Sequence, residues 1–444
     1  MSQNRVLQSS GLPRRVKAGW YILTILSVIP AVLWLFNVNL SYKFYNLAIS
    51  LRSLGDVAGL CGMAMFSLVM ILSARLKFFE KFFRGINESY TAHHFFGGLS
   101  LCFLLFHPLL ITYNYFDISF RSAALFLIPG SNFAQNLGIY GLFMMIIALV
   151  ITFYMKIKYQ FWKFTHKLIG LAFGFAFLHT FLIGADLLTN QPLKIYLLVL
   201  GIAAIITYFY RTLFADYFVR VFDYTVKNIT AHQDKIWEIE FLPKNREIKF
   251  IPGQFAFVKL INKDLTEEVH PFSLSSATGN PLRIAIKELG DYTNKIGNIK
   301  AGDSAIFDGP FGSFNFKNYA NKKQVWIAGG IGVTPFLSMM RSLTAEDYNY
   351  KIDVYYSVKD ENCVAFKEEM EQIAAVNKNL NVKIWVSKKD GFITAKSIKN
   401  LTPDLGERDI LICGPNMMMM ALKNQLLEQG INKNKIHTEE FQLY

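Results

Sequence analysis

The sequence predicts a multi-domain protein: a bundle of six transmembrane helices, then an antiparallel β-barrel and an α/β domain with a parallel sheet. Three observations support this prediction. The 444 residues are 52% hydrophobic and 15% aromatic. Long apolar stretches follow one another from residue 18 to 214, and charged and apolar residues mix from residue 215 onward. A chain of this length has room for two or three domains, which we expect at residues 1–214, 215–317 and 318–444.

Six segments of the first half approach the length of about 20 apolar residues that a membrane-spanning helix needs. The second contains Asp56, and the fourth is short. The expected spans are Ala18–Phe36, Ser53–Ser73, Thr91–Tyr113, Leu137–Tyr154, Thr165–Leu187 and Leu193–Tyr210.

Basic residues next to these spans predict their orientation. The net charge is +13, and many of the bases lie in the loops that a cytoplasmic location of both termini would place inside. We therefore expect a multi-pass protein of the plasma (cytoplasmic) membrane with both termini in the cytosol. This explains the charge without a nucleic-acid partner. The flanking bases include Arg14, Arg15, Lys17, Arg75, Lys77, Lys81, Arg84, Lys156, Lys158, Lys163, Lys167 and Arg211.

The four cysteines form no CxxC pair, so neither a disulfide framework nor a zinc site is expected. The N-terminus is polar and basic, and its first apolar run continues to spanning length, so no cleavable signal peptide is expected.

Histidines within two of the apolar segments are the strongest functional signal of the first half. The third segment carries His93, His94 and His107, and the fifth carries His166 and His179. An ionisable group at membrane depth is costly and indicates a function, whereas one isolated histidine bonded to a neighbouring helix would be structural. Two histidines on each of two segments indicate a cofactor held between them.

Helical geometry supports one pair and leaves a difficulty with the other. His93 and His107 are 14 residues apart, about 21 Å of helix rise and about 40° short of whole turns, so both rings leave nearly one face. His166 and His179 are 13 residues apart, about 19.5 Å of rise, but about 140° apart around an ideal helix. The second pair therefore needs a bulge, a curve or ligation from a flank.

Each level offers two neutral imidazoles, the usual axial ligands of a b-type haem. We expect His93 and His166 to be the metal ligands of an inner haem, and His107 and His179 those of an outer haem. Glycines of the same segments are expected to make room for the macrocycles: Gly97, Gly98, Gly170 and Gly174.

His94 is the alternative inner ligand, because it lies 13 residues before His107. Adjacent residues of a helix point to different faces. We favour His93 and interpret His94 as an interfacial residue near a haem propionate.

The second half shows two strand patterns. Residues 215–317 alternate β-branched and aromatic residues with turns, as in VFDYTVKNIT and PGQFAFVKL, which is typical of a small antiparallel barrel. Residues 318–444 alternate the runs QVWIAGG, KIDVYYSV, NVKIWVS and DILICG with helical stretches. That order predicts a parallel sheet.

Two stretches of this half indicate nucleotide binding. In WIAGGIGVTP, glycines lie between a strand and a helix, where the backbone can approach a pyrophosphate; a tight structural turn would use the same residues. HPFSLSS (270–276) places a small hydroxyl after an aromatic ring, and the GDYT turn (290–293) can hold a phosphate. For HPFSLSS and the GDYT turn, the alternative interpretation is an ordinary barrel strand followed by a polar turn.

In chain order, HPFSLSS, GDYT, DGPFG (308–312), GGIGVTP and CGPNMMM (413–419) resemble the ferredoxin–NADP reductase-like module. Joined to six apolar segments with paired histidines, the chain resembles the ferric reductase and NADPH oxidase superfamily, including bacterial NADPH oxidase-like proteins. The resemblance extends from the second apolar segment to the C-terminus. Each motif alone is unspecific, and their combination is specific. The family's pattern of a glycine four residues after the histidine, here Gly97, favours His93.

The resemblance implies FAD, two b-type haems, and NADPH or NADH as electron donor. His270 would lie near the FAD phosphates, Phe272 would pack against the isoalloxazine, and Ser273 would hydrogen-bond near its reactive nitrogen. The other residues implied for FAD are Pro271, Ser275, Gly290, Asp291, Tyr292 and Thr293, and those for the dinucleotide are Gly329, Gly330, Gly332, Thr334, Pro335, Lys359, Cys413, Gly414 and Pro415.

Two of the implied residues are the expected catalytic ones. Cys413 would lie beside the nicotinamide, and Phe441, with Tyr444 as the alternative, would cover the flavin. Lys359 stands where many relatives have arginine. Lysine pairs with a 2′-phosphate without arginine's bidentate fork, so NADPH is favoured over NADH without excluding it.

The resemblance predicts an NAD(P)H oxidase or ferric reductase-type flavocytochrome b. Electrons would pass from cytosolic NAD(P)H through FAD and both haems to an extracytoplasmic acceptor, with O2 reduced to superoxide favoured and a ferric chelate as the alternative. Animal oxidases carry a basic residue near their oxygen site, where this chain has Asp56 with Arg52 a turn away, so that site does not carry over directly. A haem-free receptor or transporter with a reductase-like regulatory domain is the alternative from another class. No EF-hand loop is evident, so direct calcium control is not expected.

Overall fold

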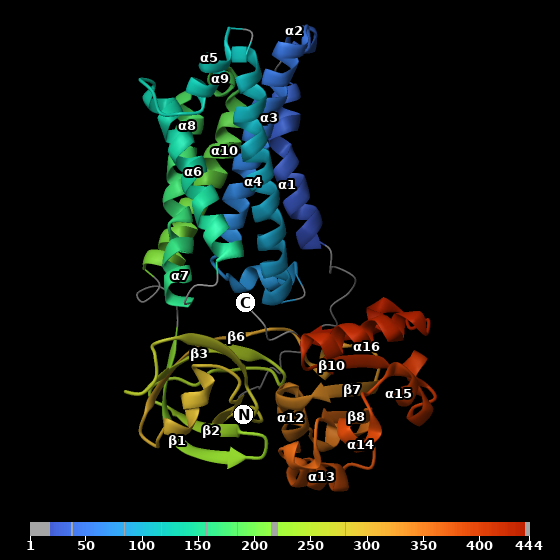
Figure 1. Cartoon of the computed structure of the whole chain (residues 1–444). Coiled ribbons are helices and arrows are strands. Elements are labelled where there is room, and N and C mark those ends of the chain that lie inside the picture. Colours follow the sequence, from blue (N-terminus) through green and yellow to red (C-terminus); the bar gives the residue numbers. More distant parts are fainter. Residues whose placement is uncertain are drawn as a thin grey trace, which may run out of the picture. The chain divides into compact units, whose positions relative to one another are not determined.

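Six helices of the first half are long and apolar enough to cross a membrane (Figure 1). The structure is a computed structural model that describes residues 18–36, 39–83, 85–116, 118–155, 159–183, 185–214, 221–279 and 281–439. The expected number of spans is confirmed. They run Ala18–Leu35, Leu47–Leu72, Glu88–Phe116, Phe133–Tyr154, Phe161–Ile183 and Gln191–Thr212.

Every span except the first extends beyond its predicted bounds at one end at least. The second span continues without a break through Asp56. The fourth begins at Phe133 because the Asn132 side chain caps it, accepting a hydrogen bond from the Gln135 N–H at 3.1 Å. The helices of this half are α1 (Ala18–Leu35), α2 (Leu40–Lys43), α3 (Leu47–Leu72), α4 (Ile86–Phe116), α5 (Phe120–Phe126), α6 (Phe133–Tyr154), α7 (Tyr159–Lys167), α8 (Ile169–Ile183), α9 (Ala185–Thr189) and α10 (Gln191–Tyr208).

The fifth span is interrupted at Leu168, between α7 and α8. There the Leu168 N–H bonds to the Thr165 carbonyl, three residues back, at 3.1 Å. Such a step winds the backbone more tightly than an α-helix. The interruption lies between His166 and His179, and it is the irregularity that their spacing requires.

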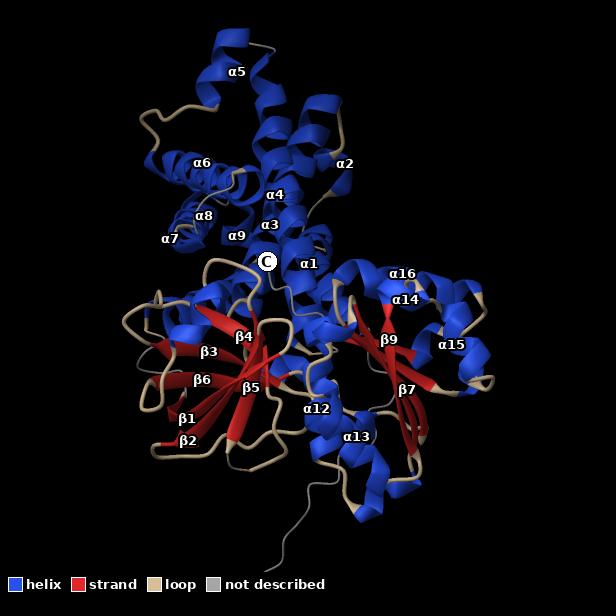
Figure 2. Cartoon of the chain, turned by 60° about the horizontal axis from the view of Figure 1, so that its bottom comes forward, coloured by secondary structure: helices blue, strands red, loops and turns tan. Residues whose placement is uncertain are grey.

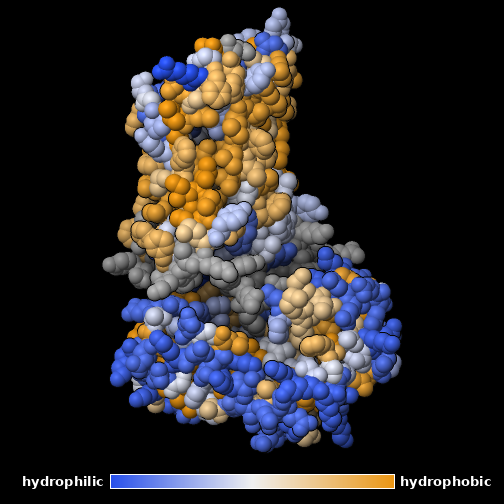
Figure 3. Space-filling model, viewed as in Figure 1, coloured by the Kyte–Doolittle hydropathy of each residue, from blue (hydrophilic) through white to orange (hydrophobic). Residues whose placement is uncertain are grey.

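Apolar side chains cover the outside of this bundle, and hydrophilic residues dominate the surface of the second half (Figure 3). A surface of this kind is stable only where lipid replaces water. Large exposed apolar residues on the bundle include Ile25, Phe143, Ile147, Phe153, Val199 and Ile206.

An antiparallel sheet of six strands begins the second half (Figure 2). Its order is β4-β3-β6-β1-β2-β5. The end strands β4 and β5 meet only through the isolated bridge between Leu274 and Ile284, so the expected barrel is not closed by a continuous ladder. The strands are β1 (Phe222–His232), β2 (Ile236–Pro243), β3 (Phe255–Ile261), β4 (Val269–Ser273), β5 (Leu282–Lys287) and β6 (Ser304–Phe311).

A parallel sheet of five strands follows, in the order β11-β10-β7-β8-β9. Four strands match the predicted runs, and the four-residue β11 was missed because IHTE has no apolar run. The elements are β7 (Lys323–Gly329), α12 (Thr334–Arg341), β8 (Lys351–Val358), α13 (Lys367–Val376), β9 (Leu380–Val386), α14 (Ser387–Asp390), α15 (Ala395–Leu401), β10 (Asp409–Cys413), α16 (Asn416–Glu428) and β11 (Ile436–Glu439).

The chain divides into a membrane unit within residues 15–219 and a soluble unit that holds both sheets. Several predicted features lie outside the described residues: both termini, Arg14, Arg15, Lys17, Arg84, Lys156, Lys158, Phe441 and Tyr444.

Candidate cofactor sites

The membrane unit brings the four predicted ligand histidines together in two pairs. The ring centres of His93 and His166 are 6.4 Å apart, and those of His107 and His179 are 6.2 Å apart. A metal bound between two imidazole nitrogens at about 2 Å each separates the ring centres by about 6 Å, because each nitrogen lies about 1 Å from its ring centre. Both pairs therefore have the separation of axial ligands.

Hydrogen bonds select the free ring nitrogen in three of these histidines. Nδ1 lies 3.1 Å from the Val69 carbonyl in His93, 2.8 Å from the Gly55 carbonyl in His107 and 2.7 Å from the Ala134 carbonyl in His179. A carbonyl only accepts, so each Nδ1 carries the proton, and Nε2 keeps its lone pair for a metal. Main-chain carbonyls on α3 and α6 thus orient these three histidines. The sequence did not identify the residues that provide them: Gly55, Val69 and Ala134.

His166 differs from the other three. Its Nδ1 is buried and bonds to none of the described residues. The indole of Trp162, one turn earlier on α7, stacks on its ring at 5.3 Å with an angle of 20°. The orientation of His166 therefore depends on ring stacking and not on a carbonyl acceptor.

Two glycines that the sequence analysis missed let the outer histidines lie against neighbouring helices. A Cβ added to Gly59 of α3 would lie 2.6 Å from His107 Nδ1, and one added to Gly138 of α6 would lie 2.7 Å from His179 Nδ1. Real Cβ atoms do not approach so closely. Each glycine therefore provides the space in which a histidine ring reaches its carbonyl.

The glycines expected to make room for macrocycles divide into two kinds. Gly98 and Gly174 have no atom within 4 Å of an added Cβ, and at Gly97 the nearest, a Val69 methyl, is at 3.8 Å. These three border open space. A Cβ on Gly170 would instead clash with the Tyr208 ring, so Gly170 serves helix packing.

The donor set at each level fits a haem better than a bare ion. Within the described ranges, no group of three or more His, Cys, Asp and Glu side chains is placed to hold a metal. Two imidazoles fill two axial positions only. Iron there would take its remaining ligands from a macrocycle, as in b-type haem.

In the soluble unit, β4 ends with a buried hydroxyl that has no partner. Ser273 is 4% exposed, and its Oγ bonds to none of the described residues. A buried polar group of this kind is costly unless a ligand satisfies it. Phe272 precedes it and packs on the core of the antiparallel sheet. A hydroxyl after an aromatic ring is the arrangement predicted to face a flavin.

His270 and the GDYT turn lie together beside this strand. The ring centres of His270 and Tyr292 lie 4.2 Å apart with their planes tilted by 33°, and His270 Nε2 bonds to Glu268 at 3.0 Å. Burial raises the pKa of Tyr292 to about 12, so its phenol stays neutral. The Thr293 hydroxyl oxygen accepts the Leu289 and Gly290 N–H groups at 2.9 and 3.0 Å, which closes the turn. Gly290 and Asp291 are exposed.

Ser275, predicted to bind FAD, makes a side-chain contact that the sequence did not indicate. Its hydroxyl donates to Glu238 Oε1 on β2 at 3.1 Å, a fully buried contact. The side chain belongs to an ion-pair network between the two sheets.

Apart from Lys359, which follows β8, the predicted dinucleotide residues meet at the carboxyl ends of β7 and β10. The chain leaves β7 for β8 on one side, and β10 lies on the other, so this is the switch point where α/β sheets bind ligands. A Cβ added to Gly332 would lie 2.6 Å from the Cys413 carbonyl carbon, and one on Gly414 would lie 3.0 Å from the Gly329 Cα. Gly330 has φ +53°. The turn is therefore built by close backbone contact. Thr334 and Pro335 open α12, and Pro415 precedes α16.

Cys413 ends β10 and is fully buried. Burial raises the pKa of its thiol well above the usual range, and the nearby Glu439 carboxylate adds to the rise. The thiol is therefore protonated at neutral pH and suited to packing beside a ring, not to nucleophilic attack. β11 ends at Glu439, opposite Cys413 in the parallel register. Phe441 is two residues beyond, outside the described residues.

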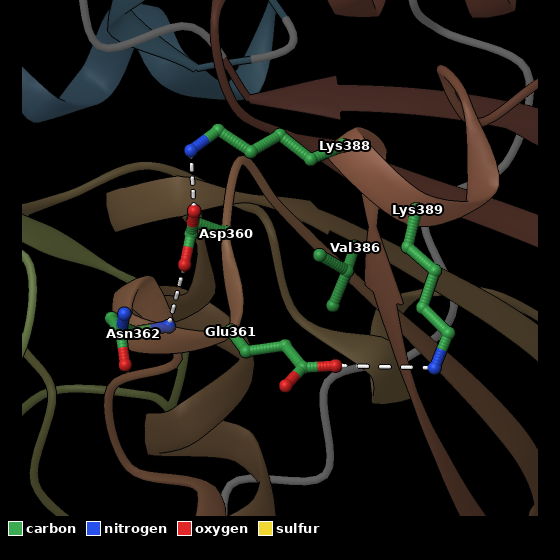
Figure 4. Close-up of a pocket in the computed structure, with 6 residues that line it drawn as sticks. All are labelled: Asp360, Glu361, Asn362, Val386, Lys388 and Lys389. Carbon is green, nitrogen blue, oxygen red and sulfur yellow. Dashed lines mark hydrogen bonds and ion pairs between the residues drawn. The ribbon is translucent and has the colours of Figure 1, made fainter.

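A pocket of about 280 Å³ lies beyond the ends of β8 and β9 (Figure 4). Lys388 pairs with Asp360 at 2.5 Å and Lys389 with Glu361 at 3.9 Å. Lys359, predicted to pair with a 2′-phosphate, does not line this pocket, although its carbonyl accepts the Lys388 N–H at 3.2 Å. Sequence reasoning missed both pocket lysines because they follow β9, away from any recognised motif.

Three family models match the chain. Residues 58–177 match the ferric reductase like transmembrane component. Residues 221–334 match an FAD-binding domain, and residues 326–424 match the oxidoreductase NAD-binding domain.

The similar proteins include a flavohaemoprotein and a reductase subunit by name. Flavohemoprotein B of Dictyostelium discoideum is 31% identical over 219 residues, 43% of this chain and 52% of that protein. The glycine betaine monooxygenase reductase subunit of Chromohalobacter salexigens is 28% identical over 206 residues, 43% of this chain and 56% of that protein. The chain thus spans about half the length of the curated relatives it matches. Among solved structures, the flavohem-like FAD/NAD-binding domain of nitric oxide dioxygenase from Vibrio cholerae O1 biovar El Tor has 23% identity and a TM-score of 0.44, covering 49% of this chain and 97% of that one.

Proposed function

The chain joins the transmembrane, FAD-binding and NAD-binding domains that define the ferric reductase and NADPH oxidase architecture, and from this premise we propose that it moves electrons across a membrane. The donor is cytosolic NADPH or NADH. The route leads through FAD and two b-type haems to an acceptor on the extracytoplasmic side.

The cofactors supply the redox chemistry, since FAD takes two electrons at once and can release them singly to haems that carry one each. The chain's own residues bind and orient. His93 and His166 would hold the inner haem, and His107 and His179 the outer haem. In the soluble unit Ser273 would bond to the flavin edge.

The single observation that carries this proposal is the geometry of the two histidine pairs. Both ring separations, 6.4 and 6.2 Å, suit axial ligation, and three of the four rings donate Nδ1–H to main-chain carbonyls. A purely structural histidine needs one partner, not a second histidine at this distance. His93 has this relation to His166, which supports it as an inner ligand.

The nicotinamide would be bound at the glycine turn. Gly329, Gly330, Gly332, Thr334 and Pro335 lie at the switch point of the sheet, with Cys413, Gly414 and Pro415 against them. Phe441 would cover the flavin, because it follows β11 by two residues and β11 ends beside Cys413. The remaining FAD contacts are assigned to His270, Pro271, Phe272, Gly290, Asp291, Tyr292 and Thr293.

We favour O2 as acceptor, with superoxide as product. The support is the closeness of HPFSLSS and GDYT to the oxidase versions of these motifs. Ferric chelate reduction is the second candidate, favoured by the match of the membrane unit to the ferric reductase like component and by Asp56 in place of a basic residue. The location is the plasma membrane with both termini in the cytosol, supported by the distribution of basic residues.

The purified chain in detergent, supplied with NADPH and cytochrome c, tests the acceptor. Superoxide production predicts cytochrome c reduction that superoxide dismutase suppresses. Reduction that ignores the dismutase, together with reduction of ferric citrate, would establish the ferric candidate instead. A preparation without a Soret band and a reduced α-band would instead favour the alternative, a haem-free receptor or transporter.

A further inference from the structure

One helix connects the proposed nicotinamide turn to the proposed flavin strand. α12 begins at Thr334, directly after the glycine turn, and is eight residues long, ending at Arg341. Figure 2 shows this helix between the antiparallel sheet and the parallel sheet. The helix therefore starts at the proposed nicotinamide turn and runs between the two sheets (Figure 2).

Arg341 uses its whole guanidinium group to bind both sheets. One terminal nitrogen donates to Glu238 Oε1 at 2.7 Å and to the Ser275 carbonyl at 2.9 Å. The other reaches Glu238 Oε2 at 3.3 Å and Glu369 Oε2 at 2.7 Å, and Nε reaches Glu369 Oε1 at 2.6 Å. Glu238 belongs to β2 of the antiparallel sheet, and Glu369 to α13 beside the parallel sheet.

The Arg341 and Glu238 side chains are shielded from water, whereas the Glu369 side chain is 36% exposed. The side chains of Arg341 and Glu238 are only 7% and 8% exposed. The Ser275 hydroxyl donates to the same Glu238 oxygen at 3.1 Å, and the Phe366 ring lies 5.8 Å from the guanidinium carbon. Paired bidentate bonds from a planar group fix both direction and distance.

A second bond holds the same helix one turn earlier. The Ser338 hydroxyl donates to the Ser276 carbonyl at 2.7 Å, also fully buried. The two bonds from α12 therefore reach consecutive residues, Ser275 and Ser276, which follow closely on Phe272 and Ser273. The end of the flavin motif is tied to the helix that carries the nicotinamide turn.

Stability alone does not account for this arrangement. A buried ion pair can often be replaced by apolar residues without loss of stability, because desolvation offsets the attraction. The directed bonds from Arg341 to two carboxylates and one carbonyl instead fix the position of α12 relative to the segment that follows β4.

We propose that Arg341 is a positioning residue that sets the distance between nicotinamide and flavin. The inference rests on the proposed function. In the step concerned, a hydride passes from the reduced nicotinamide to FAD, which oxidises the dinucleotide by two electrons and reduces FAD by two. Misplacement of reacting atoms by about 1 Å can slow such a step on the order of a hundredfold. Arg341 touches neither reacting group and acts through α12.

The test is anaerobic stopped-flow reduction of FAD by NADPH in the full-length chain, for wild type, Arg341→Lys and Ser338→Ala. Lysine keeps the charge but cannot bond both carboxylates in two planar pairs. For Arg341→Lys we expect the saturating rate constant to fall on the order of tenfold or more, with FAD content and the Kd of NADPH nearly unchanged. For Ser338→Ala we expect a fall of a few-fold, since one hydrogen bond is lost.

Arg408→Lys is the matched control. Arg408 is also buried and pairs with two carboxylates, Asp353 and Asp404, each at 2.8 Å, but both belong to the parallel-sheet part of the chain. This variant should lower thermal stability without changing flavin reduction. A kinetic isotope effect with nicotinamide deuterated at the transferred position should persist in Arg341→Lys.

The proposal is overturned if Arg341→Lys reduces FAD at the wild-type rate, or if Arg408→Lys slows it equally. Should Arg341→Lys fail to fold, an unchanged rate in Ser338→Ala overturns it as well. If neither NADPH nor NADH reduces FAD in the wild type, the proposed function itself fails, and this inference with it.

Discussion

In the membrane unit the proposed ligands are side chains that main-chain carbonyls orient, whereas in the soluble unit the main chain itself forms the proposed dinucleotide site. His107 and His179 reach Gly55 and Ala134 carbonyls. At Gly332, by contrast, the absence of a side chain allows the backbone to touch Cys413. Removing a side chain should therefore have its largest effect in the membrane unit, and adding one to the main-chain site should have its largest effect in the soluble unit.

Removing a histidine should have the largest effect. We expect His107→Ala to lose about one haem of two, because the outer haem would lose an axial ligand, and to keep its FAD. The pyridine haemochrome assay measures haem per chain. His94→Ala, which removes another histidine of the same helix, should keep both haems. Unchanged haem content in His107→Ala would remove this residue from the ligand set.

Adding a methyl group in the soluble unit should come second. Gly332→Ala places a Cβ 2.6 Å from the Cys413 carbonyl carbon, which pushes the turn away from β10. Flavin reduction by NADPH should slow on the order of tenfold to a hundredfold, with haem content unchanged. Gly406→Ala, where nothing lies within 4 Å, should leave the rate as in the wild type. Wild-type kinetics in Gly332→Ala would show that the close backbone approach is not needed.

A methyl group added in the membrane unit should act through the histidine ring that it displaces. Gly138→Ala places a Cβ 2.7 Å from His179 Nδ1, so the ring can no longer reach the Ala134 carbonyl freely. We expect partial loss of the outer haem and a normal inner haem, seen by low-temperature absorption of the reduced α-band. Equal loss of both haems would point to general disruption of the bundle.

The smallest expected effect is a difference in reduction potential between the two proposed haems. Both outer rings donate Nδ1–H at 2.8 and 2.7 Å, whereas the inner pair has one such bond at 3.1 Å and the Nδ1 of His166 meets no described acceptor. Such bonds make imidazole a stronger donor and stabilise oxidised iron. The outer haem should therefore have the lower reduction potential. If these bonds change the equilibrium constant for reduction of the haem tenfold, the difference is about 59 mV. A spectroscopic redox titration in which His107→Ala removes the higher-potential wave would contradict this.

Much of this organisation follows from patterns along the sequence. The spans were predictable because each is a long apolar run, and four of the parallel strands because they are apolar runs between helical stretches. The histidine pairs were predictable for a similar reason, since polar groups are rare in such runs.

The rest depends on contacts between distant segments. The helix interruption at Leu168 has no proline or glycine at that residue, so nothing local marks it. Gly59 and Gly138 are important only because α4 and α8 place histidine rings against them. Ser275 was assigned to FAD from its motif, but its hydroxyl bonds to Glu238, 37 residues earlier. The sequence also could not show that β4 and β5 meet in a single bridge.

The ratio of haem to FAD in the purified wild-type chain tests the central claim most directly. The proposed function predicts two b-type haems and one FAD per chain, with a six-coordinate low-spin spectrum for both haems. A chain that binds FAD but no haem, or a single haem that both His93→Ala and His107→Ala abolish, would contradict the assignment of two histidine pairs to two haems.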